Sequence, residues 1–466
     1  MLAPDPGDLG TVTGLTRSRD FTLRIDGREA FVYHAAKTTA SALSAQGVNY
    51  CSFAFTGGPV TLTLGSSAAV REWLVQPTGP TPIPKSAAHS AELIIDSPRK
   101  LLVTARLESG GERYFILSAE PPESGVPAAD APGVLWLGPG VHRYGRAWNP
   151  YVNGIHTVYL APGAVVEATL KVRDRHGIRL LGRGLFIQAA FPHGKTVGGN
   201  GWYCDYMGMY FRDCTDLTIE GIASLGSPSF QLEVANCDRV SLRNLKLCGF
   251  GDHNNDGMHL YSRNVVAEDC FIAGNDDRIC LNGLFDADLP PAEAARLEKA
   301  DRLISVPVHD VLVRRMVFWG LKNGGDIMIT WNAGQSTHRI VVEDCDSLAA
   351  TNKAFVTSRH AGSGVASGLL FRHCRIEHGD LVDLEVADSG KYWGRGGGRI
   401  GDITFEDISL AAAPSSVGKS LRGRDPTGTL GPLTFTRITA NGQPVTVLDQ
   451  TAINTGDHVL AAKFIP

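Results

Sequence analysis

The chain has 466 residues, 20% of them charged, and a formal net charge of −4. This balance provides no basic surface for a nucleic-acid backbone, so nucleic-acid binding is not expected. No run of about 18 apolar residues occurs, so we expect no membrane-spanning segment. The length exceeds that of one typical compact domain, which predicts two domains or an elongated repeat with an appendage.

The first ten residues, MLAPDPGDLG, have neither a basic start nor an apolar stretch. We therefore expect a protein that is secreted or periplasmic, with its signal peptide absent from this sequence, or one that is cytoplasmic. The oligomeric state is not indicated by any pattern in the sequence.

Short alternating strands dominate the N-terminal part of the chain. Apolar and polar residues alternate in the segments 21–35, 48–55, 60–65, 91–97, 100–107 and 113–119, with turn residues between them. This spacing is typical of a β-sandwich. Residues 119–134 are rich in Pro and Ala without periodicity, as in a linker. We predict a β-sandwich domain with its linker over residues 1–130 and a second domain over residues 131–466.

A short apolar pattern recurs through the second domain. The unit is apolar, any, apolar, two mostly polar residues, apolar. Its first positions are Leu217, Val240, Val265, Val311, Ile340, Leu369, Ile403 and Leu433, so the unit returns about every 30 residues, as in solenoids. Strand periodicity in such a repeat, with Gly, Asn and Asp at its turns, predicts a right-handed parallel β-helix. The predicted fold class is all-β, a β-sandwich followed by this solenoid.

The nine cysteines form no C-x-x-C pair, and their odd number argues against a complete disulfide framework. Cys270, Cys345 and Cys374 occupy the last position of the repeat unit, where other units carry Ile, Leu or Met. Cysteine in such a position behaves as a small hydrophobic residue. We expect most of the cysteines to be reduced and buried.

One segment has helical spacing. Residues 290–304 begin with proline and carry apolar residues at helical intervals, within the long step between Val265 and Val311. A short helical flap is predicted there, just after an acidic cluster.

Three aspartates form that cluster. Asp256 lies in an NNDG segment, and Asp276 and Asp277 lie in an NDD segment about one repeat later. Neighbouring coils of a stacked sheet are about 4.8 Å apart, so the carboxylates are expected about 5–10 Å from one another. Crowded acids repel, so at least one should hold its proton more tightly than a free aspartate. A protonated acid beside ionised ones is suited to cleaving a glycosidic bond.

Asp276 and Asp277 are adjacent, so on a regular strand their side chains would point to opposite faces. The preceding Gly274 and Asn275 favour a bend that turns both toward one cleft. NDG and NDD are also ordinary turn sequences, so composition alone favours a turn-capping role over catalysis.

At these motifs the chain resembles the polygalacturonase-like clan of β-helix glycoside hydrolases, which includes family 28 and the dextranase and isopullulanase family 49. Both families carry an Asp in an N-x-D-G-like segment and a pair in G/N-D-D about one coil later, here Asp256 and then Asp276 and Asp277. The resemblance spans roughly residues 140–440. It implies that Asp276 is the general acid, that Asp256 and Asp277 position and deprotonate the attacking water, that the anomeric configuration inverts, and that no metal or other cofactor is used.

The sequence departs from family 28 after the aspartate pair. That family carries a Gly-His-Gly segment and then an Arg-Ile-Lys segment that binds the uronate, whereas here no GHG occurs and DIMITW, residues 326–331, stands in the place of the second. An acid there, Asp326, should repel galacturonate. Trp319, Asn323, Gly324 and Trp331 are similar to family 49, as is an N-terminal β-sandwich. We therefore expect a neutral, α-linked oligo- or polysaccharide substrate, similar to dextran or another α-glucan.

The candidate substrate-binding residues are His253, Trp319, Lys322, Asp326, Trp331 and Tyr206. The tryptophans offer apolar faces on which a sugar ring packs, although Trp319 also fits a core position. His253 precedes Asp256 by three residues and is suited to bonding a hydroxyl or tuning the acids, or to a plain turn. Lys322 would hold a neighbouring carboxylate ionised.

Other functions fit the same fold. A pectin-type polygalacturonase or a polysaccharide lyase would act on uronates, and a lyase would release unsaturated products that absorb ultraviolet light. A non-catalytic carbohydrate-binding β-helix protein would bind saccharide without releasing reducing ends.

Overall fold

The computed structural model describes residues 5–10, 12–36, 47–55, 57–78, 84–191, 207–250, 254–282, 306–331, 333–349, 351–388, 395–412, 419–447, 450 and 453–466. No α-helix occurs within these ranges, and the predicted helix at 290–304 lies outside them. The described chain is therefore built from strands and the turns that connect them.

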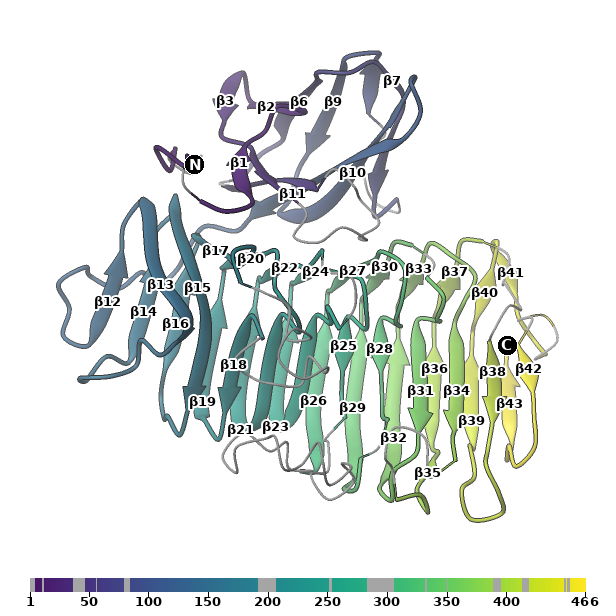
Figure 1. The fold of residues 1–466 in the computed structure, drawn as a ribbon. Coiled ribbons are helices and arrows are strands. Elements are labelled where there is room, and N and C mark those ends of the chain that lie inside the picture. The colour runs from purple at the N-terminus through teal and green to yellow at the C-terminus, as the bar shows by residue number, and fades with distance from the viewer. Residues whose placement is uncertain are drawn as a thin grey trace.

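Two sheets form the N-terminal unit (Figure 1). The six-stranded sheet has the order β1 (Leu15–Arg17), β4 (Tyr33–Ala35), β5 (Val48–Ala54), β11 (Glu112–Glu120), β10 (Arg99–Leu107) and β7 (Val70–Gln76). The five-stranded sheet has the order β3 (Arg28–Ala30), β2 (Phe21–Ile25), β6 (Val60–Ser66), β9 (Ser90–Ile95) and β8 (Lys85–Ala87). Alternating side chains of both sheets meet in one apolar core, which is the packing of a β-sandwich.

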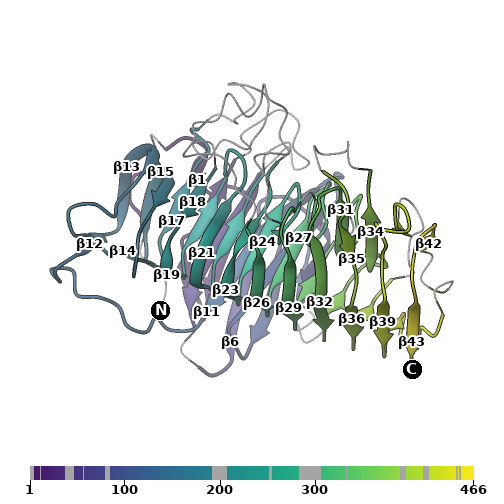
Figure 2. The same cartoon turned by 90° about the horizontal axis from the view of Figure 1, so that it is seen from below.

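The remaining strands stack in parallel into three faces of a solenoid, beginning with β12, which follows a strand-free segment after β11. The repeat sheet contains β12 (Val134–Leu137), β14 (Thr157–Leu160), β16 (Arg179–Gly182), β19 (Thr215–Glu220), parts of β21 (Leu232–Arg243) and β23 (Met258–Glu268), then β26 (Val308–Arg314), β29 (Thr337–Glu343), β32 (Val365–Arg372), β36 (Ile403–Glu406), β39 (Leu433–Thr436) and β43 (Ala462–Ile465). Figure 2 shows these strands side by side.

The second face, the sandwich-facing sheet, contains β13 (Gly140–Trp148), β15 (Ala164–Arg173), β17 (Leu185–Ile187), β20 (Ala223–Leu225), β22 (Lys246–Cys248), β24 (Phe271–Gly274), β27 (Val317–Gly320), β30 (Asp346–Ser347), β33 (Arg375–Ile376), β37 (Ser409–Leu410) and β40 (Thr439–Ala440). The third face, the site sheet, runs from the end of β15 through β18 (Met209–Arg212), the first halves of β21 and β23, β25 (Ile279–Cys280), β28 (Ile327–Met328), β31 (Val356–His360), β34 (Val382–Val386), β38 (Ser420–Arg422) and β42 (Asn454–Thr455). Two short strands, β35 (Arg399–Ile400) and β41 (Gln443–Pro444), pair at the margins of this stack. The arrangement confirms the predicted fold class, a β-sandwich followed by a right-handed parallel β-helix.

The repeated apolar positions line the interior of the solenoid. The first positions of the units, from Leu217 to Leu433, are at most 3% exposed. Toward the C-terminus the third position is phenylalanine in successive coils, and the rings of Phe371, Phe405, Phe435 and Phe464 stack with centroids 5.1, 5.0 and 4.7 Å apart. The cysteines among the described residues are buried and form no disulfide, as expected for small apolar groups.

The coils bend at residues in the left-handed conformation, which Asp and Asn tolerate better than most residues. Four aspartates with φ of 52–57° occupy such bends, and each pairs with an arginine one coil away. The pairs are Asp216–Arg239 at 2.6 Å, Asp269–Arg315 at 2.7 Å, Asp310–Arg339 at 2.6 Å and Asp407–Arg437 at 2.6 Å. We call these four aspartates the bend acids.

The sandwich packs on the solenoid along the sandwich-facing sheet, over β17 to β30 (Figure 1). An apolar layer that includes Leu102 and Ile116 of the sandwich and Phe271 of the solenoid fills the contact. At its edge the buried carboxylate of Glu120 pairs with Lys246 at 2.6 Å and Arg183 at 2.7 Å. A buried carboxylate needs such partners, so the two domains share one interior.

Candidate active site

The three aspartates of the acidic cluster converge. Asp256 precedes β23, and Asp276 and Asp277 lie in the bend between β24 and β25, one coil further on. Each offers a carboxylate oxygen within 4.8 Å of the others. This is closer than the 5–10 Å expected from coil spacing, because the bend turns both members of the pair toward Asp256. Asp256 and Asp277 are buried, and Asp276 is partly exposed.

Asp276 is the most strongly perturbed member. Burial raises the pKa of its carboxyl well above the usual value, and the negative charges of Asp256 and Asp277 raise it further. Its Oδ1 accepts hydrogen bonds from the Asn323 side chain at 3.0 Å and from the Asp277 N–H at 3.1 Å. Asp276 is therefore the group best suited to hold a proton at neutral pH beside ionised neighbours.

Asp277 is held from the following coil. Its Oδ1 accepts the Gly325 N–H at 2.6 Å. Burial and the charge of Asp256 raise the pKa of Asp277 to about 6. Gly324 makes this approach possible: its φ is +74°, and a Cβ there would lie 2.3 Å from the Asp277 nitrogen. Glycine is thus needed for both its conformation and its lack of a side chain.

Arg278 stabilises the bend that carries Asp276 and Asp277. Its guanidinium is buried, pairs with Asp326 at 2.8 Å, and donates to the carbonyls of Asp276 at 2.9 Å, Asn323 at 2.8 Å and Gly324 at 3.0 Å. These bonds tie the acid pair to the following turn, so Arg278 fixes the backbone of the site rather than facing a ligand.

The predicted role of Asp326 is wrong. Its side chain is buried, and its charge is balanced by Arg278 and further satisfied by the Ser347 hydroxyl. A neutralised carboxylate inside the solenoid cannot repel a uronate in a cleft. Sequence order placed this residue near the uronate-binding segment, but its side chain faces the interior.

Asp256 belongs to a second buried group. His259 on β23 lies with its Nε2 3.0 Å from Asp256 Oδ2 and its Nδ1 3.0 Å from Glu233 Oε2 on β21. Burial alone would lower the histidine pKa, but hydrogen bonds and charge from both carboxylates outweigh it and raise the pKa to about 9. Asp256 Oδ1 is buried and has no hydrogen-bond partner among the described residues.

A small pocket opens beside Asp256. It is lined by Phe230, Asp256, His259, Tyr261, Cys280, Asn282, Met328 and Trp331. Trp331 is half-buried, and its backbone N–H donates to Asn282 Oδ1 at 2.9 Å. The structure therefore brings predicted Trp331 to the acids, next to the aromatic rings of Phe230 and Tyr261.

Other predicted residues lie elsewhere. Trp319 is 5% exposed, and its ring lies 4.8 Å from that of Tyr114 in the layer between the two domains, which contradicts its assignment to substrate binding. Lys322 is exposed, and the cations that influence Asp277 are Arg278 and Lys353 instead. His253 and Tyr206 lie outside the described residues.

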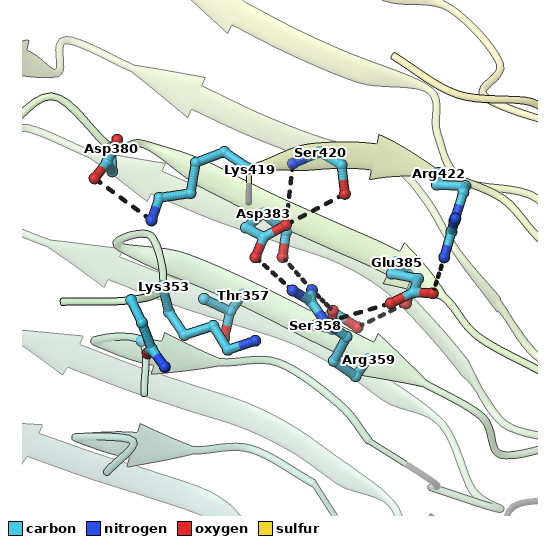
Figure 3. A network of polar contacts seen from close by, with 12 residues as sticks. Lys353, Thr357, Ser358, Arg359, Asp380, Asp383, Glu385, Lys419, Ser420 and Arg422 are labelled. Carbon is cyan, nitrogen blue, oxygen red and sulfur yellow. Dashed lines mark hydrogen bonds and ion pairs between the residues drawn. The ribbon is translucent and has the colours of Figure 1, made fainter. Parts of the chain in front are cut away.

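Charged side chains continue along the site sheet beyond the acids (Figure 3). Arg359 on β31 pairs with Asp383 at 2.5 Å and with Glu385 at 3.3 Å, both on β34. Lys419 pairs with Asp380 at 3.5 Å. Arg359 and Lys419 thus both have carboxylate partners on these coils.

Two residues of the site were not singled out by sequence reasoning. Glu233 and His259 are direct register partners on β21 and β23. Aligning the coils by their apolar positions would have placed this acid and this imidazole side by side.

Two sets of side chains have the composition of a cation site, Asp256 with His259 and Cys280, and Asp256 with Asp276 and Asp277. Both ring nitrogens of His259 already face carboxylates, and the raised pKa of Asp276 favours a bound proton. The donor sets fit proton chemistry better than a metal. The described residues contain no helix with the length and apolarity to cross a membrane.

Comparison with known proteins places these features in context. The family model for glycosyl hydrolases family 28 matches residues 205–284, which hold all three aspartates. A probable polygalacturonase of Arabidopsis thaliana is 28% identical over 142 residues, covering 28% of this chain and 31% of that protein. A probable rhamnogalacturonase A of Aspergillus oryzae is 22% identical over 179 residues, covering 38% of this chain and 32% of that protein. The matched segments thus span about a third of the length of these relatives.

Solved structures share the fold over more of the chain. Dex49A from Penicillium minioluteum superposes with a TM-score of 0.65 and 13% identity, covering 99% of this chain and 96% of that one. A family 28 exopolygalacturonase of Yersinia enterocolitica superposes with a TM-score of 0.51 and 12% identity, covering 87% of this chain and 96% of that one. At these identities the likeness shows the fold alone.

Proposed function

We propose that the chain is a member of the polygalacturonase-like clan of β-helix glycoside hydrolases and that it hydrolyses the glycosidic bonds of an oligo- or polysaccharide with Asp256, Asp276 and Asp277. The observation that carries this proposal is the meeting of the three carboxylates within 4.8 Å, with a raised pKa on Asp276. A turn-capping role is not supported, because the bend acids show how such aspartates are held here, partly exposed and each paired with an arginine.

Asp276 would act as the general acid. Its O–H donates a proton to the glycosidic oxygen as the bond from that oxygen to the anomeric carbon breaks. A water oxygen forms the new bond to the anomeric carbon, and its proton passes to Asp256 or Asp277. The products are a hemiacetal and a free hydroxyl group, and solvent then returns a proton to Asp276 and removes one from the base.

The stereochemical course proposed is inversion, which the family resemblance implies. The nearest oxygens of the acids lie within 4.8 Å of one another, whereas the carboxyl groups of inverting enzymes are typically about 6.5–9.5 Å apart. A retaining path would use one carboxylate as nucleophile. The anomeric form of the first product distinguishes the two.

A neutral substrate is supported by the pairing of three cations of the site, Arg278, Arg359 and Lys419, with carboxylates. Binding a uronate requires a cation that is free to accept a carboxylate. Arg278 is buried on Asp326, Arg359 is held by Asp383 and Glu385, and Lys419 faces Asp380. The probable polygalacturonase relative favours the second candidate, hydrolysis of galacturonan.

Release of reducing ends from dextran, pullulan, galacturonan and arabinan, with product anomers followed by NMR, tests the proposal. We expect release from a neutral α-glucan, inverted first product, and no ultraviolet-absorbing product. Release from galacturonan alone would overturn the neutral substrate, and retained configuration would overturn inversion. Unsaturated products would identify a lyase, and binding without release would identify a non-catalytic protein.

A further inference from the structure

The group formed by Asp256, His259 and Glu233 has no place yet in the proposed reaction. It is fully internal: the three side chains are at most 3% exposed. One imidazole joins two carboxylates at 3.0 Å on either side. Burying two carboxylates with a single neutral imidazole between them would leave one acceptor facing a ring nitrogen without a proton, which is costly. The geometry therefore calls for an imidazolium that donates to both.

The titratable groups that the described residues place around the imidazole agree with this charge state. Glu233 faces it from β21, Asp256 from the turn before β23, Tyr261 from its own strand and Cys280 from β25. Burial raises the pKa of the Tyr261 hydroxyl and of the Cys280 thiol well above their ordinary values, so both stay neutral. The Phe230 ring, 4.0 Å from the imidazole by centroids, adds a π face that favours a cation.

The two oxygens of Asp256 have different surroundings. Oδ2 receives the His259 Nε2–H at 3.0 Å and the Cys280 thiol at 3.6 Å. Oδ1 is buried without a partner among the described residues. A carboxylate fixed through one oxygen presents the other in a set direction, which is what a base needs in order to accept a proton from a bound water.

We infer that Glu233 and His259 are positioning residues: Glu233 anchors a protonated His259, and His259 fixes Asp256 as a carboxylate with Oδ1 free to receive the proton of the attacking water. This inference rests on the proposed hydrolysis. It adds a function for the site sheet, in which the charge of one coil sets the state of the base on the next. The cation also offsets the repulsion among the acids.

The test uses the isosteric variant Glu233→Gln. The amide oxygen still accepts the Nδ1–H, but one of the two negative charges is gone, so His259 loses its proton at a lower pH. Once the ring is neutral with its proton on Nδ1, the bare Nε2 faces Asp256 Oδ2 and the base is no longer held. We expect kcat at pH 7 to fall about 10- to 100-fold, as for loss of an orienting partner, with KM within about twofold.

Two further variants complete the design. In Glu233→Gln the rate should recover toward acidic pH as His259 is protonated again, whereas His259→Gln, which has a donor but no charge, should stay slow at every pH. Ser262→Ala is the matched control, because Ser262 is buried on the same strand and bonds only backbone groups, Val234 O at 2.9 Å and the Cys237 N–H at 2.9 Å. Its kcat and pH profile should match the wild type.

A superimposable pH profile for Glu233→Gln and wild type would overturn the inference while leaving hydrolysis intact. If the wild type cleaves none of the saccharides, the proposed function fails, and the charge state is tested separately by ¹⁵N NMR of the imidazole, assigned by the loss of its signals in His259→Gln. Both ring nitrogens should be protonated at pH 7 in the wild type and not in Glu233→Gln. A neutral wild-type ring at pH 7 would also contradict the inference.

Discussion

The bend acids and the site acids are the same residue type on the same solenoid, and their surroundings give them opposite properties. Asp310, at a bend, is partly exposed, and the hydrogen bonds that it accepts from Arg339 and His309 hold its pKa below the ordinary value. Asp276, in the site, is mostly enclosed, and burial with two neighbouring carboxylates raises its pKa well above that value. Aspartates that stabilise a coil lie at its surface and pair with an arginine. Buried aspartates that lie together without one cation for each carboxylate destabilise the fold, so their presence indicates a function.

Replacing one acid from each set should give the widest contrast. Asp276→Asn is expected to reduce kcat about 10²–10⁴-fold, the contribution of a general acid, because an amide cannot protonate the leaving oxygen. Its unfolding midpoint should not fall, since the carboxyl already carries a proton. Asp269→Asn, at a bend, is the control and should keep full kcat. Comparable rates for the two variants in the reducing-end assay would show that the site acid and the bend acid do not differ in function.

Gly324 tests whether the crowding of the site acids depends on the next coil. Gly324→Ala places a Cβ 2.3 Å from the Asp277 nitrogen and adds a left-handed residue, so we expect a loss of about 1–3 kcal/mol of stability. Displacing the acid pair should also reduce kcat about 100-fold.

Gly27→Ala is the matched control for that variant. Gly27 has φ +77° in a sandwich turn, and nothing lies within 4 Å of its added Cβ. It should share the conformational cost, measured by denaturant unfolding, and keep kcat. Equal kcat losses in both variants would show that the effect is general instability.

The two sets should also respond oppositely to pH. With the pKa of Asp277 raised from 3.8 to about 6, the unfolded chain releases this proton before the folded chain does. Stability from this group is therefore present below pH 3.8 and is lost as pH rises toward and through 6. Asp277→Asn should match the wild type near pH 4 and be more stable above pH 6, in urea titrations across that range.

Asp310→Asn should show the reverse sign. The lowered pKa of Asp310 gives stability that is present above the ordinary value of 3.8 and is lost as pH falls through the lower, folded-state value. The variant should therefore be slightly less stable than the wild type at pH 7, with the difference shrinking in acid. A wild-type advantage for Asp277 at pH 7 would contradict the assignment of that residue.

The smallest effect is expected from a bend pair alone. Arg315→Met removes the partner of Asp269, but the two side chains are 43% and 38% exposed. Solvent screens such a pair, so a loss of about 0.2–1 kcal/mol is expected, with no change in kcat. A larger loss in thermal unfolding would mean that bend pairs contribute more to the solenoid than exposed ion pairs usually do.

The period of the sequence was sufficient to predict the solenoid, because inward positions such as Leu217 and Leu433 repeat one apolar pattern at every coil. The aspartate trio was recognisable because its motifs lie within one uninterrupted coil step. What the pattern leaves open is the environment of outward side chains. Trp319 alternates correctly on its strand, but only the structure shows that the sandwich covers that face.

Contacts between side chains on different coils could not be predicted from the sequence either. Asp326 and Arg278 are separated by an insertion of irregular length, so their buried pairing at 2.8 Å has no local signal. Glu233 and His259 are 26 residues apart and meet only once the strands are in register. Strand periodicity predicts the face on which a residue lies. The contacts between coils that set the charge of its side chain also depend on the lengths of the loops, because these bring residues of different coils into register.

The central claim is that Asp276 holds a proton at neutral pH among ionised neighbours. Infrared difference spectroscopy between the wild type and Asp276→Asn, titrated from acidic to neutral pH, tests it without any substrate. A protonated-carboxyl band that is present in the wild type at pH 6–7 and missing in the variant is the predicted result. A band that vanishes near the ordinary aspartate value of 3.8 would contradict the account.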